Sequence, residues 1–472
     1  MSINYGDKIP DGSDLSTVIS YFQVLNNKVK ELKTDLNTIL QNEGVKVTDT
    51  DTMTDLIVKT DNEFDNKNTK AENTRSKLAG LMKDGGYDIT GKEDIDTLLG
   101  LLTVSGIKLD EIKQIACGHS HTIILKNDGS LWSCGYNGKG ELGLGDTTYR
   151  SVFTQVTTNI NNDVKQVVCG YYFTFILKND GSLWSCGYNE YGQLGSGTKD
   201  YDSHSTFTKV TTNINNDVKQ IACGRYHTFI LKNDGTLWSC GYNEYGQLGL
   251  GNTTDRTTFT QVTTNINNDV KQIACGYYHT FILNNDGSVW VCGRNNNGQS
   301  GLGDATDITT FTKVTNDVKQ IACGEYHTII LKTDGSIWSC GKNNNGQLGL
   351  GDKTVKTTFT KVTTNINNDV KQIACGHSHT IILKNDGSLW SCGYNSRGHL
   401  GLGDTTDKTT FTKVTTNINN DVKQIACGQN HTVILKTDGN VYACGYNSNG
   451  QLGLGNTIDC TSFTSIPKGL SY

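Results

Sequence analysis

One segment of this sequence occurs seven times, and this repetition constrains the fold more than any other feature. The first copy runs Ile115-Ala-Cys-Gly-His-Ser-His-Thr-Ile-Ile-Leu-Lys-Asn-Asp-Gly-Ser-Leu-Trp-Ser-Cys-Gly135. Its first cysteine recurs at intervals of 52, 54, 52, 48, 52 and 52 residues, as Cys117, Cys169, Cys223, Cys275, Cys323, Cys375 and Cys427. Self-similarity at such a period indicates a repeat array or a propeller.

Each repeat contains four short segments that are typical of β-strands. In the first repeat they are residues 113–117, 122–125, 130–134 and 153–156. The Asn-Asp-Gly sequence at 127–129 is a strong hairpin signal, because glycine adopts a positive φ without strain. A glycine-rich loop at 135–145 leads to the fourth segment. Four strands in each of seven units predict a mainly β fold, a seven-bladed β-propeller.

The two ends of the repeat region suggest how the ring closes. A Phe-Thr-x-Val strand precedes each later repeat but not the first, and the chain ends with Phe463-Thr-Ser-Ile466. We therefore predict that this last strand pairs into the first blade and leaves no exposed sheet edge.

The repeat resembles the regulator of chromosome condensation family over residues 111–472. The matching positions of the first copy are Gly118, His121, Asp128, Gly129, Trp132 and the run Gly135-x-Asn137-x-x-Gly140-x-Leu142-Gly143-x-Gly145. The resemblance implies the propeller fold but says little about function. Propellers of this family serve as exchange factors, chromatin binders, light sensors and interaction platforms.

The chain before the repeats divides into residues 1–40 and 41–110. Apolar residues in the first part alternate at spacings of four and three, as Val18, Phe22, Leu25, Val29, Leu32, Leu36 and Ile39. This heptad seam predicts a coiled-coil helix that joins copies of the chain, as a homotrimer or a dimer. Packing of the helix within its own chain is the alternative.

Two related units lie 42 residues apart, beginning near Leu36 at the end of the seam and near Leu78, and most of both falls within residues 41–110. Each unit is expected to form a helix, a glycine stop, a short extended piece and a second short helix. The pattern is similar to segments in tail and fibre proteins of phages of Gram-positive bacteria. That resemblance implies an attachment segment at 1–40 and a stalk or adaptor at 41–110.

Charge and hydropathy exclude some classes of partner. Residues 1–110 hold 13 Lys or Arg and 19 Asp or Glu, a net charge of −6, which leaves about +1 for the rest of a chain of net charge −5. Neither part has the basic excess that nucleic-acid binding requires. No stretch approaches 18 apolar residues, and no secretory signal is visible, so we expect neither membrane insertion nor export by a signal peptide.

The cysteines and histidines repeat with the blades. Fourteen of the 15 cysteines occur two per blade, each before a glycine, which favours buried free thiols over intrablade disulfides; Cys460 is the odd one. The histidines at one repeat position are His121, His227, His279, His327, His379 and His431. Phe173 takes this place in blade two, which favours a structural role over Cys-x-x-x-His metal pairs. We therefore expect no metal and no cofactor.

Differences between the repeats indicate a binding surface. Strand direction places the Cys-Gly-x-x-His and Cys-Gly-x-Asn-x-x-Gly loops on one face and the Asn-Asp-Gly turns on the other. The second face is nearly uniform, whereas the longer loops of the first vary, at Tyr188, Glu190, Tyr191, Tyr242, Glu244, Tyr245, Arg294, Lys342 and Arg397. The predicted binding residues are Tyr171, Tyr172, Tyr191, Arg225, Tyr226, Tyr245, Tyr277, Tyr278 and Tyr326. Ordinary loop residues without a ligand are the alternative.

These features favour a receptor-binding tail fibre of a phage or phage-like particle. The propeller would contact a glycan or protein on the host surface, and the N-terminus would attach to the tail or baseplate of the virion. An intracellular propeller that binds a small GTPase or nucleosomes, a cell-surface adhesion protein and a propeller lyase or hydrolase are the alternatives. No catalytic constellation or nucleotide-binding loop stands out, so we expect no enzyme.

Overall fold

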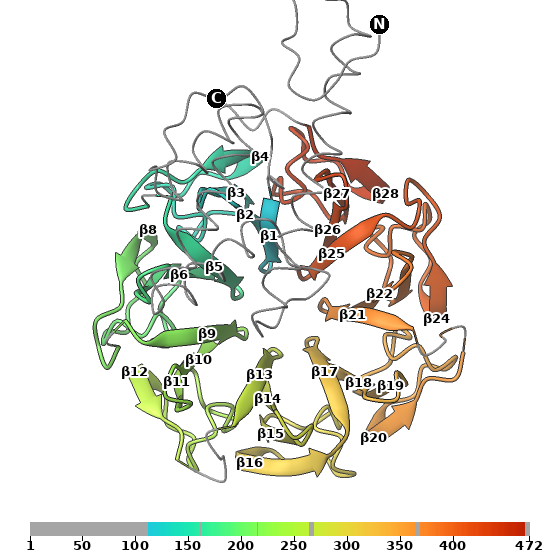
Figure 1. Ribbon diagram of the computed structural model, residues 1–472, viewed down its shortest axis with the longest axis horizontal. Helices are drawn as coiled ribbons and strands as arrows, with labels where there is room; N and C mark the ends of the chain where they lie inside the picture. The colour runs from blue at the N-terminus through green and yellow to red at the C-terminus, as the bar shows by residue number, and fades with distance from the viewer. Residues whose placement is uncertain are drawn as a thin grey trace, which may run out of the picture. The chain divides into compact units, whose positions relative to one another are not determined.

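The computed structural model describes residues 112–160, 162–214, 216–263, 269–364, 366 and 369–467. The chain divides into two compact units, residues 1–111 and 112–472. The second unit is a ring of seven four-stranded antiparallel sheets, so the predicted seven-bladed propeller is confirmed (Figure 1). The coiled-coil seam and the two stalk units lie outside the described residues.

Each blade is built from four consecutive strands, the first nearest the axis. Blade one has β1 (Ile112–Cys117), β2 (His121–Lys126), β3 (Leu131–Gly135) and β4 (Arg150–Gln155). Blade two has β5 (Val164–Cys169), β6 (Phe173–Lys178), β7 (Leu183–Gly187) and β8 (His204–Lys209). Blade three has β9 (Val218–Cys223), β10 (His227–Lys232), β11 (Leu237–Gly241) and β12 (Arg256–Gln261). Blade four has β13 (Val270–Cys275), β14 (His279–Asn284), β15 (Val289–Gly293) and β16 (Ile308–Thr315).

The last three blades repeat this order. Blade five has β17 (Val318–Cys323), β18 (His327–Lys332), β19 (Ile337–Gly341) and β20 (Lys356–Lys361). Blade six has β21 (Val370–Cys375), β22 (His379–Lys384), β23 (Leu389–Gly393) and β24 (Lys408–Lys413). Blade seven has β25 (Val422–Cys427), β26 (His431–Lys436), β27 (Val441–Gly445) and β28 (Cys460–Ser465). Among the described residues there is no helix of the length and hydrophobicity needed to span a bilayer.

The hydrophobic core lies between neighbouring blades. The second strand of each blade is buried on both faces, which explains its continuous run of apolar and β-branched residues. Ile123 and Leu125 of β2 pack in one cluster with Val167 and Ile176 of blade two and with Phe207 of the outer strand β8. Each blade therefore completes its neighbour's core, and a single repeat has no core of its own.

The predicted closure by a spare strand is wrong. The last strand, β28, pairs with β27 of its own blade, so every blade is a continuous segment of chain. The joint between blades seven and one is made by side chains and loops instead. The Ile115 N–H donates to Gln424 Oε1 (3.2 Å), and the Gly455 N–H donates to Ser151 O (2.8 Å).

All 15 cysteines are free thiols. The cysteines of the third strands are buried, and their Sγ atoms donate to backbone carbonyls of the preceding blade, as Cys134 does to Gln451 O (3.6 Å). Burial raises the pKa of Cys117 to about 12 and that of Cys134 well above its ordinary value. Cys460 is half-buried in β28.

Candidate functional site

The loops gather at the two ends of the blades, as strand direction predicts. The loops at 118–120 and 136–149 meet at one end, where the Tyr136 N–H donates to Ser120 O (2.8 Å). The turns lie at the other end, where the Asn179 N–H donates to Asp163 O (2.9 Å). We call the first end, with its equivalents in all blades, the aromatic face and the second the turn face.

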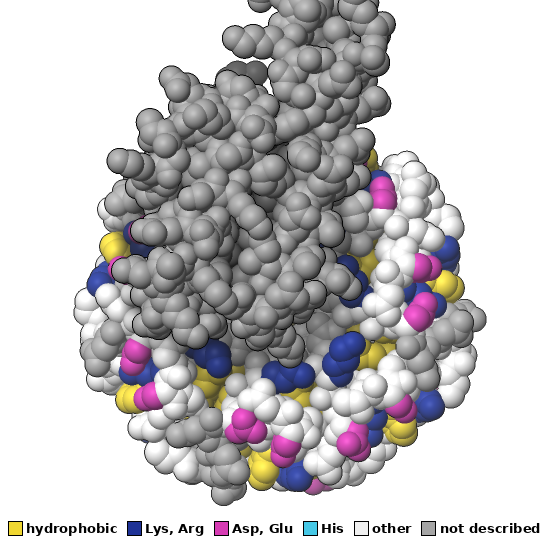
Figure 2. Space-filling view, viewed as in Figure 1, with side chains coloured by type: hydrophobic (Ala, Val, Ile, Leu, Met, Phe, Trp, Pro, Cys, Tyr) yellow, Lys and Arg dark blue, Asp and Glu magenta, His cyan; other side chains and the backbone are white. Residues whose placement is uncertain are grey.

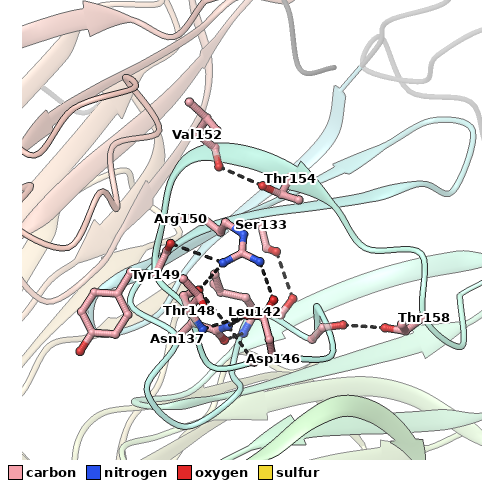
Figure 3. A network of polar contacts seen from close by, with 11 residues as sticks. Ser133, Asn137, Leu142, Asp146, Thr148, Tyr149, Arg150, Val152, Thr154 and Thr158 are labelled. Atoms are coloured by element: carbon pink, nitrogen blue, oxygen red, sulfur yellow. Dashed lines mark hydrogen bonds and ion pairs between the residues drawn. The ribbon is translucent and has the colours of Figure 1, made fainter. Parts of the chain in front are cut away.

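A buried asparagine fixes each glycine-rich loop of the aromatic face (Figure 3). In blade one, Asn137 Oδ1 accepts the Leu142 N–H (3.0 Å), and Asn137 Nδ2 donates to Thr148 O (3.1 Å). The Asp146 carboxylate closes the loop by accepting from Arg150 (2.6 Å). The loops are thus internally cross-linked, and their variable side chains stand on a similar backbone in every blade.

The nine predicted binding residues come together in one cluster. They belong to blades two to five, and their rings are in contact. Tyr171 lies 4.4 Å from Tyr172 and 5.6 Å from Tyr277, measured between ring centroids. The remaining ring contacts join Tyr191 to Tyr226, Tyr171 to Tyr226, Tyr245 to Tyr278, Tyr277 to Tyr278 and Tyr277 to Tyr326, with centroids 5.0 to 6.4 Å apart.

Two arginines are inserted among the tyrosines. The Arg225 guanidinium carbon lies 4.5 Å from the Tyr171 ring centroid and 5.1 Å from that of Tyr277. Arg294 lies 4.6 Å from the Tyr245 centroid, and it was not among the predicted binding residues. The sequence did contain a signal for Arg294, because blade four alone carries arginine directly after the second Cys-Gly. Cation–π stacking of this kind holds both arginines in place while part of each stays accessible.

The axial end of this cluster contains a small cavity of about 100 Å³. It is lined by the seven Cys-Gly pairs and by His119, Tyr171, Arg225, Tyr277, His377 and Gln429. Burial, and then the Glu325 carboxylate, raise the pKa of the Tyr277 hydroxyl, which has no hydrogen-bond partner among the described residues.

The six repeat histidines have the structural role that the sequence favoured. Each is buried, and its Nε2 hydrogen-bonds a threonine hydroxyl of the next blade, as His227 does with Thr280 (2.9 Å) and His431 does with Thr122 (3.0 Å) across the closing joint. Burial lowers the pKa of His227 to about 3. Phe173 interrupts this belt of hydrogen bonds at one joint. The described residues hold no group of three His, Cys, Asp or Glu arranged for a metal.

A set of lysines on the turn face was not predicted from the sequence. Every innermost strand carries lysine at its second position, as Lys113, Lys165, Lys219, Lys271, Lys319, Lys371 and Lys423. All are exposed except Lys423, which is half-buried. They were overlooked because binding residues were sought among the differences between repeats, whereas these lysines are identical in all seven.

Comparisons with known proteins agree on one family. Residues 101–318 match the RCC1-like domain, and residues 334–383, 386–435 and 438–471 match the regulator of chromosome condensation (RCC1) repeat. The chain is 32% identical over 371 residues to the ultraviolet-B receptor UVR8 of Arabidopsis thaliana, covering 78% of this chain and 72% of the receptor. It is 38% identical over 314 residues to the X-linked retinitis pigmentosa GTPase regulator of Canis lupus familiaris, covering 64% of this chain but only 31% of that protein.

Solved structures agree on the fold. Human WBSCR16 is 26% identical, with a TM-score of 0.63 over 69% of this chain and 87% of that one. Yeast RCC1 (Prp20), solved bound to Kap60, has a TM-score of 0.65 over 77% of this chain and 86% of that one. At 22% identity, the yeast protein supports the fold alone.

These relatives overturn the tail-fibre interpretation. The relatives named above are a plant photoreceptor and a mammalian GTPase regulator, which are eukaryotic proteins and not parts of a virion. The expected host receptor, the tail or baseplate partner and the virion location are wrong with it. The predicted homotrimer or dimer depends on the coiled-coil seam, which lies outside the described residues. The error arose because a loose resemblance in residues 41–110 was given too much weight. The chain belongs to the family of regulator of chromosome condensation (RCC1) repeat proteins.

Proposed function

We propose that this propeller is a protein-interaction module without catalytic chemistry of its own, and that a small GTPase docks on its aromatic face. The observation that carries the proposal is the gathering of the differences between blades into one tyrosine–arginine cluster. In a ring of near-identical repeats, a partner that contacts several blades needs such a local departure from the repeat to recognise one position and orientation.

The composition of the cluster suits a protein surface. Tyrosine and arginine, together with tryptophan, are enriched at the energetic centres of protein interfaces. Ring contacts already restrict Tyr226 and Tyr278, so a partner would order them at little further entropic cost.

The choice of a small GTPase rests on the family and on charge. One relative is named a GTPase regulator, and the chain spans only 31% of it. Among the proteins of the same fold, Prp20p of Saccharomyces cerevisiae binds Gsp1p and histones. Because Arg225 and Arg294 lie within the cluster, a partner surface that is as basic as a histone is disfavoured there.

The proposal is tested by biolayer interferometry with the full chain and a panel of purified small GTPases in GDP-bound, GTP-analogue-bound and nucleotide-free states. We expect one GTPase to bind and the double variant Tyr226→Ala/Tyr278→Ala to weaken it at least tenfold. The control Lys361→Ala/Lys413→Ala changes two exposed residues of the turn face and should bind as the wild type does.

Absence of binding across the panel, or equal losses in both double variants, would contradict the proposal. If a GTPase does bind, the rate at which it releases a fluorescent GDP analogue in the presence of the propeller would distinguish exchange activity from binding alone.

A further inference from the structure

The centre of the turn face, where the innermost strands surround the axis of the ring, carries exposed lysines; we call this centre the hub. Figure 2 shows Lys or Arg side chains around the hub, over β9, β13, β17 and β21. These strands carry Lys219, Lys271, Lys319 and Lys371, each at the second position of the strand and each exposed. Lys165 of β5 holds the same position and is exposed as well. We call these five residues the hub lysines.

The inner strands hold the hub lysines at one height around the axis. The residue after each hub lysine is a glutamine, and the amides of Gln272, Gln320 and Gln372 bridge to the next blade. Gln272 Nε2 donates to Ile321 O (2.8 Å), and Gln272 Oε1 accepts the Ile321 N–H (3.1 Å). The same bridge, between Gln114 and Val167, joins blades one and two (2.8 and 3.1 Å). The bridges from Gln272 and Gln320 therefore hold β13, β17 and β21, which carry Lys271, Lys319 and Lys371, in register.

The aspartates that lie two residues before the hub lysines form no ion pair with them. In blades two, three and six, the aspartate two residues before the hub lysine pairs with a different lysine, at the end of the second strand, whereas in blade four Asp269 accepts a hydrogen bond from Asn285 (2.6 Å). Asp163 pairs with Lys178 (3.1 Å) and Asp217 with Lys232 (3.1 Å), and both of these lysines are nearly buried. The hub lysines form no ion pair with any residue that the structure describes. The hub lysines surround one axis, and their joint effect on a ligand should be strongest at low salt, because the Debye length is only about 8 Å at physiological salt.

The residues around the hub lysines indicate which kind of ligand could bind there. Lysine ammonium groups bind phosphate oxygens as point charges, and the hub lysines have neither an arginine fork nor an aromatic ring among them for a planar carboxylate or a base. The Asp-Gly turns between second and third strands, as at Asp180 and Asp334, lie outside the hub beside lysines such as Lys209 and Lys361, so negative and positive charges are mixed there.

We infer that the hub of the turn face binds a compact, multiply phosphorylated molecule, such as an inositol polyphosphate, through the hub lysines. The site lies on the face opposite to the proposed GTPase site, so either proposal can fail without the other.

The test is isothermal titration of the full chain with inositol hexakisphosphate at 50 and 150 mM salt. The hub variant is Lys219→Gln/Lys271→Gln/Lys319→Gln. The matched control is Lys209→Gln/Lys361→Gln/Lys413→Gln, which removes the same charge from the exposed ends of outer strands on the same face. We expect the hub variant to raise Kd at least tenfold and to flatten the salt dependence, and the control to raise Kd less than threefold.

Three further ligands define the chemistry and its source. Citrate should bind at least tenfold more weakly than inorganic tripolyphosphate if phosphate is required. Vesicles of phosphatidylcholine with phosphatidylinositol 4,5-bisphosphate test a lipid-held source, and binding to these or to the soluble compound supports the site. Equal losses in the two triple variants, no binding by the wild type, or tighter binding of a 20-base-pair DNA duplex than of inositol hexakisphosphate would overturn it.

Discussion

Glu141 shows how a single residue departs from the repeat without breaking it. Five other blades have glutamine at this position, and blade six has His399. Glu141 is buried, and its Oε2 accepts the Lys139 N–H (2.9 Å) just as Gln193 Oε1 accepts the Tyr191 N–H (2.9 Å) in blade two. Burial raises the pKa of Glu141 to about 8, so at neutral pH the carboxyl is mostly protonated and resembles the glutamine amide.

The stability of the propeller should therefore fall as pH rises because of Glu141. Its folded pKa lies above the ordinary 4.5, so the stabilising contribution is complete below pH 4.5 and is lost as pH rises through 8. Each pKa unit corresponds to about 1.4 kcal/mol, which makes the expected loss a few kcal/mol. Glu141→Gln should abolish this loss in urea unfolding at pH 6 and pH 9, and Gln193→Glu should add a second one. An unchanged pH dependence in Glu141→Gln would show that the carboxyl reaches solvent.

At the scale of the element, the second strand of each blade carries a side chain that links it to the next blade. Each begins with a histidine that bonds to the next blade, except β6, which begins with Phe173. At that joint the Thr228 hydroxyl still donates to Gln193 O (2.9 Å), and Phe173 fills its site with no exposed surface. The threonine thus keeps a partner when the histidine is replaced by a ring of similar size.

From this we predict that His227→Phe and His227→Ala differ widely. Thr280 donates to Gln247 O (3.0 Å) in either case, so the phenylalanine should cost less than about 1 kcal/mol of unfolding free energy. Alanine leaves a cavity and should cost about 2–4 kcal/mol. Guanidinium unfolding of both variants checks the difference, and similar losses would mean that the histidine hydrogen bond, not the packing, sets the stability.

The same histidines predict sensitivity to acid. Burial lowers the pKa of His121, His227, His279, His327 and His431 to about 3, below the ordinary 6.5. The stability linked to their neutral form is present above pH 6.5 and is lost as pH falls toward 3. Circular dichroism during acid titration should show that His227→Phe/His279→Phe unfolds at a lower pH than the wild type. An unfolding midpoint at the same or a higher pH would exclude these residues as the cause.

At the scale of the whole molecule, the closing joint has the same chemistry as the internal ones. Gln424 Oε1 of blade seven accepts the Ile115 N–H of blade one, just as Gln372 Oε1 of blade six accepts the Ile425 N–H of blade seven. Gln424→Ala and Gln372→Ala should therefore lower the free energy of unfolding by similar amounts, about 1 kcal/mol each. Thermal unfolding of both variants checks this. A much larger loss for Gln424→Ala would mean that the ring opens first where its two ends meet.

Repetition made most of the fold predictable and also set the limits of prediction. The seven copies indicated seven blades, and the fourth strand of blade one, expected at 153–156, lies at 150–155. Strand direction separated the two faces, and variation between copies located the tyrosine cluster. The closing joint was missed because a strand pattern does not name its pairing partner, and β28 simply pairs with the strand before it. The hub lysines were missed because they do not vary, and their effect depends on the ring that brings them together.

The cysteines of the folded ring should react slowly with alkylating reagents, whereas those of the unfolded chain should react readily. Fourteen thiols, two in every blade, have pKa values raised by burial, so few are thiolates at neutral pH while the blades stay together. A blade that detaches exposes its own pair and also the third-strand thiol of the following blade, which donates to one of its carbonyls. The mass added by a brief pulse of iodoacetamide would thus report, molecule by molecule, whether the ring had opened.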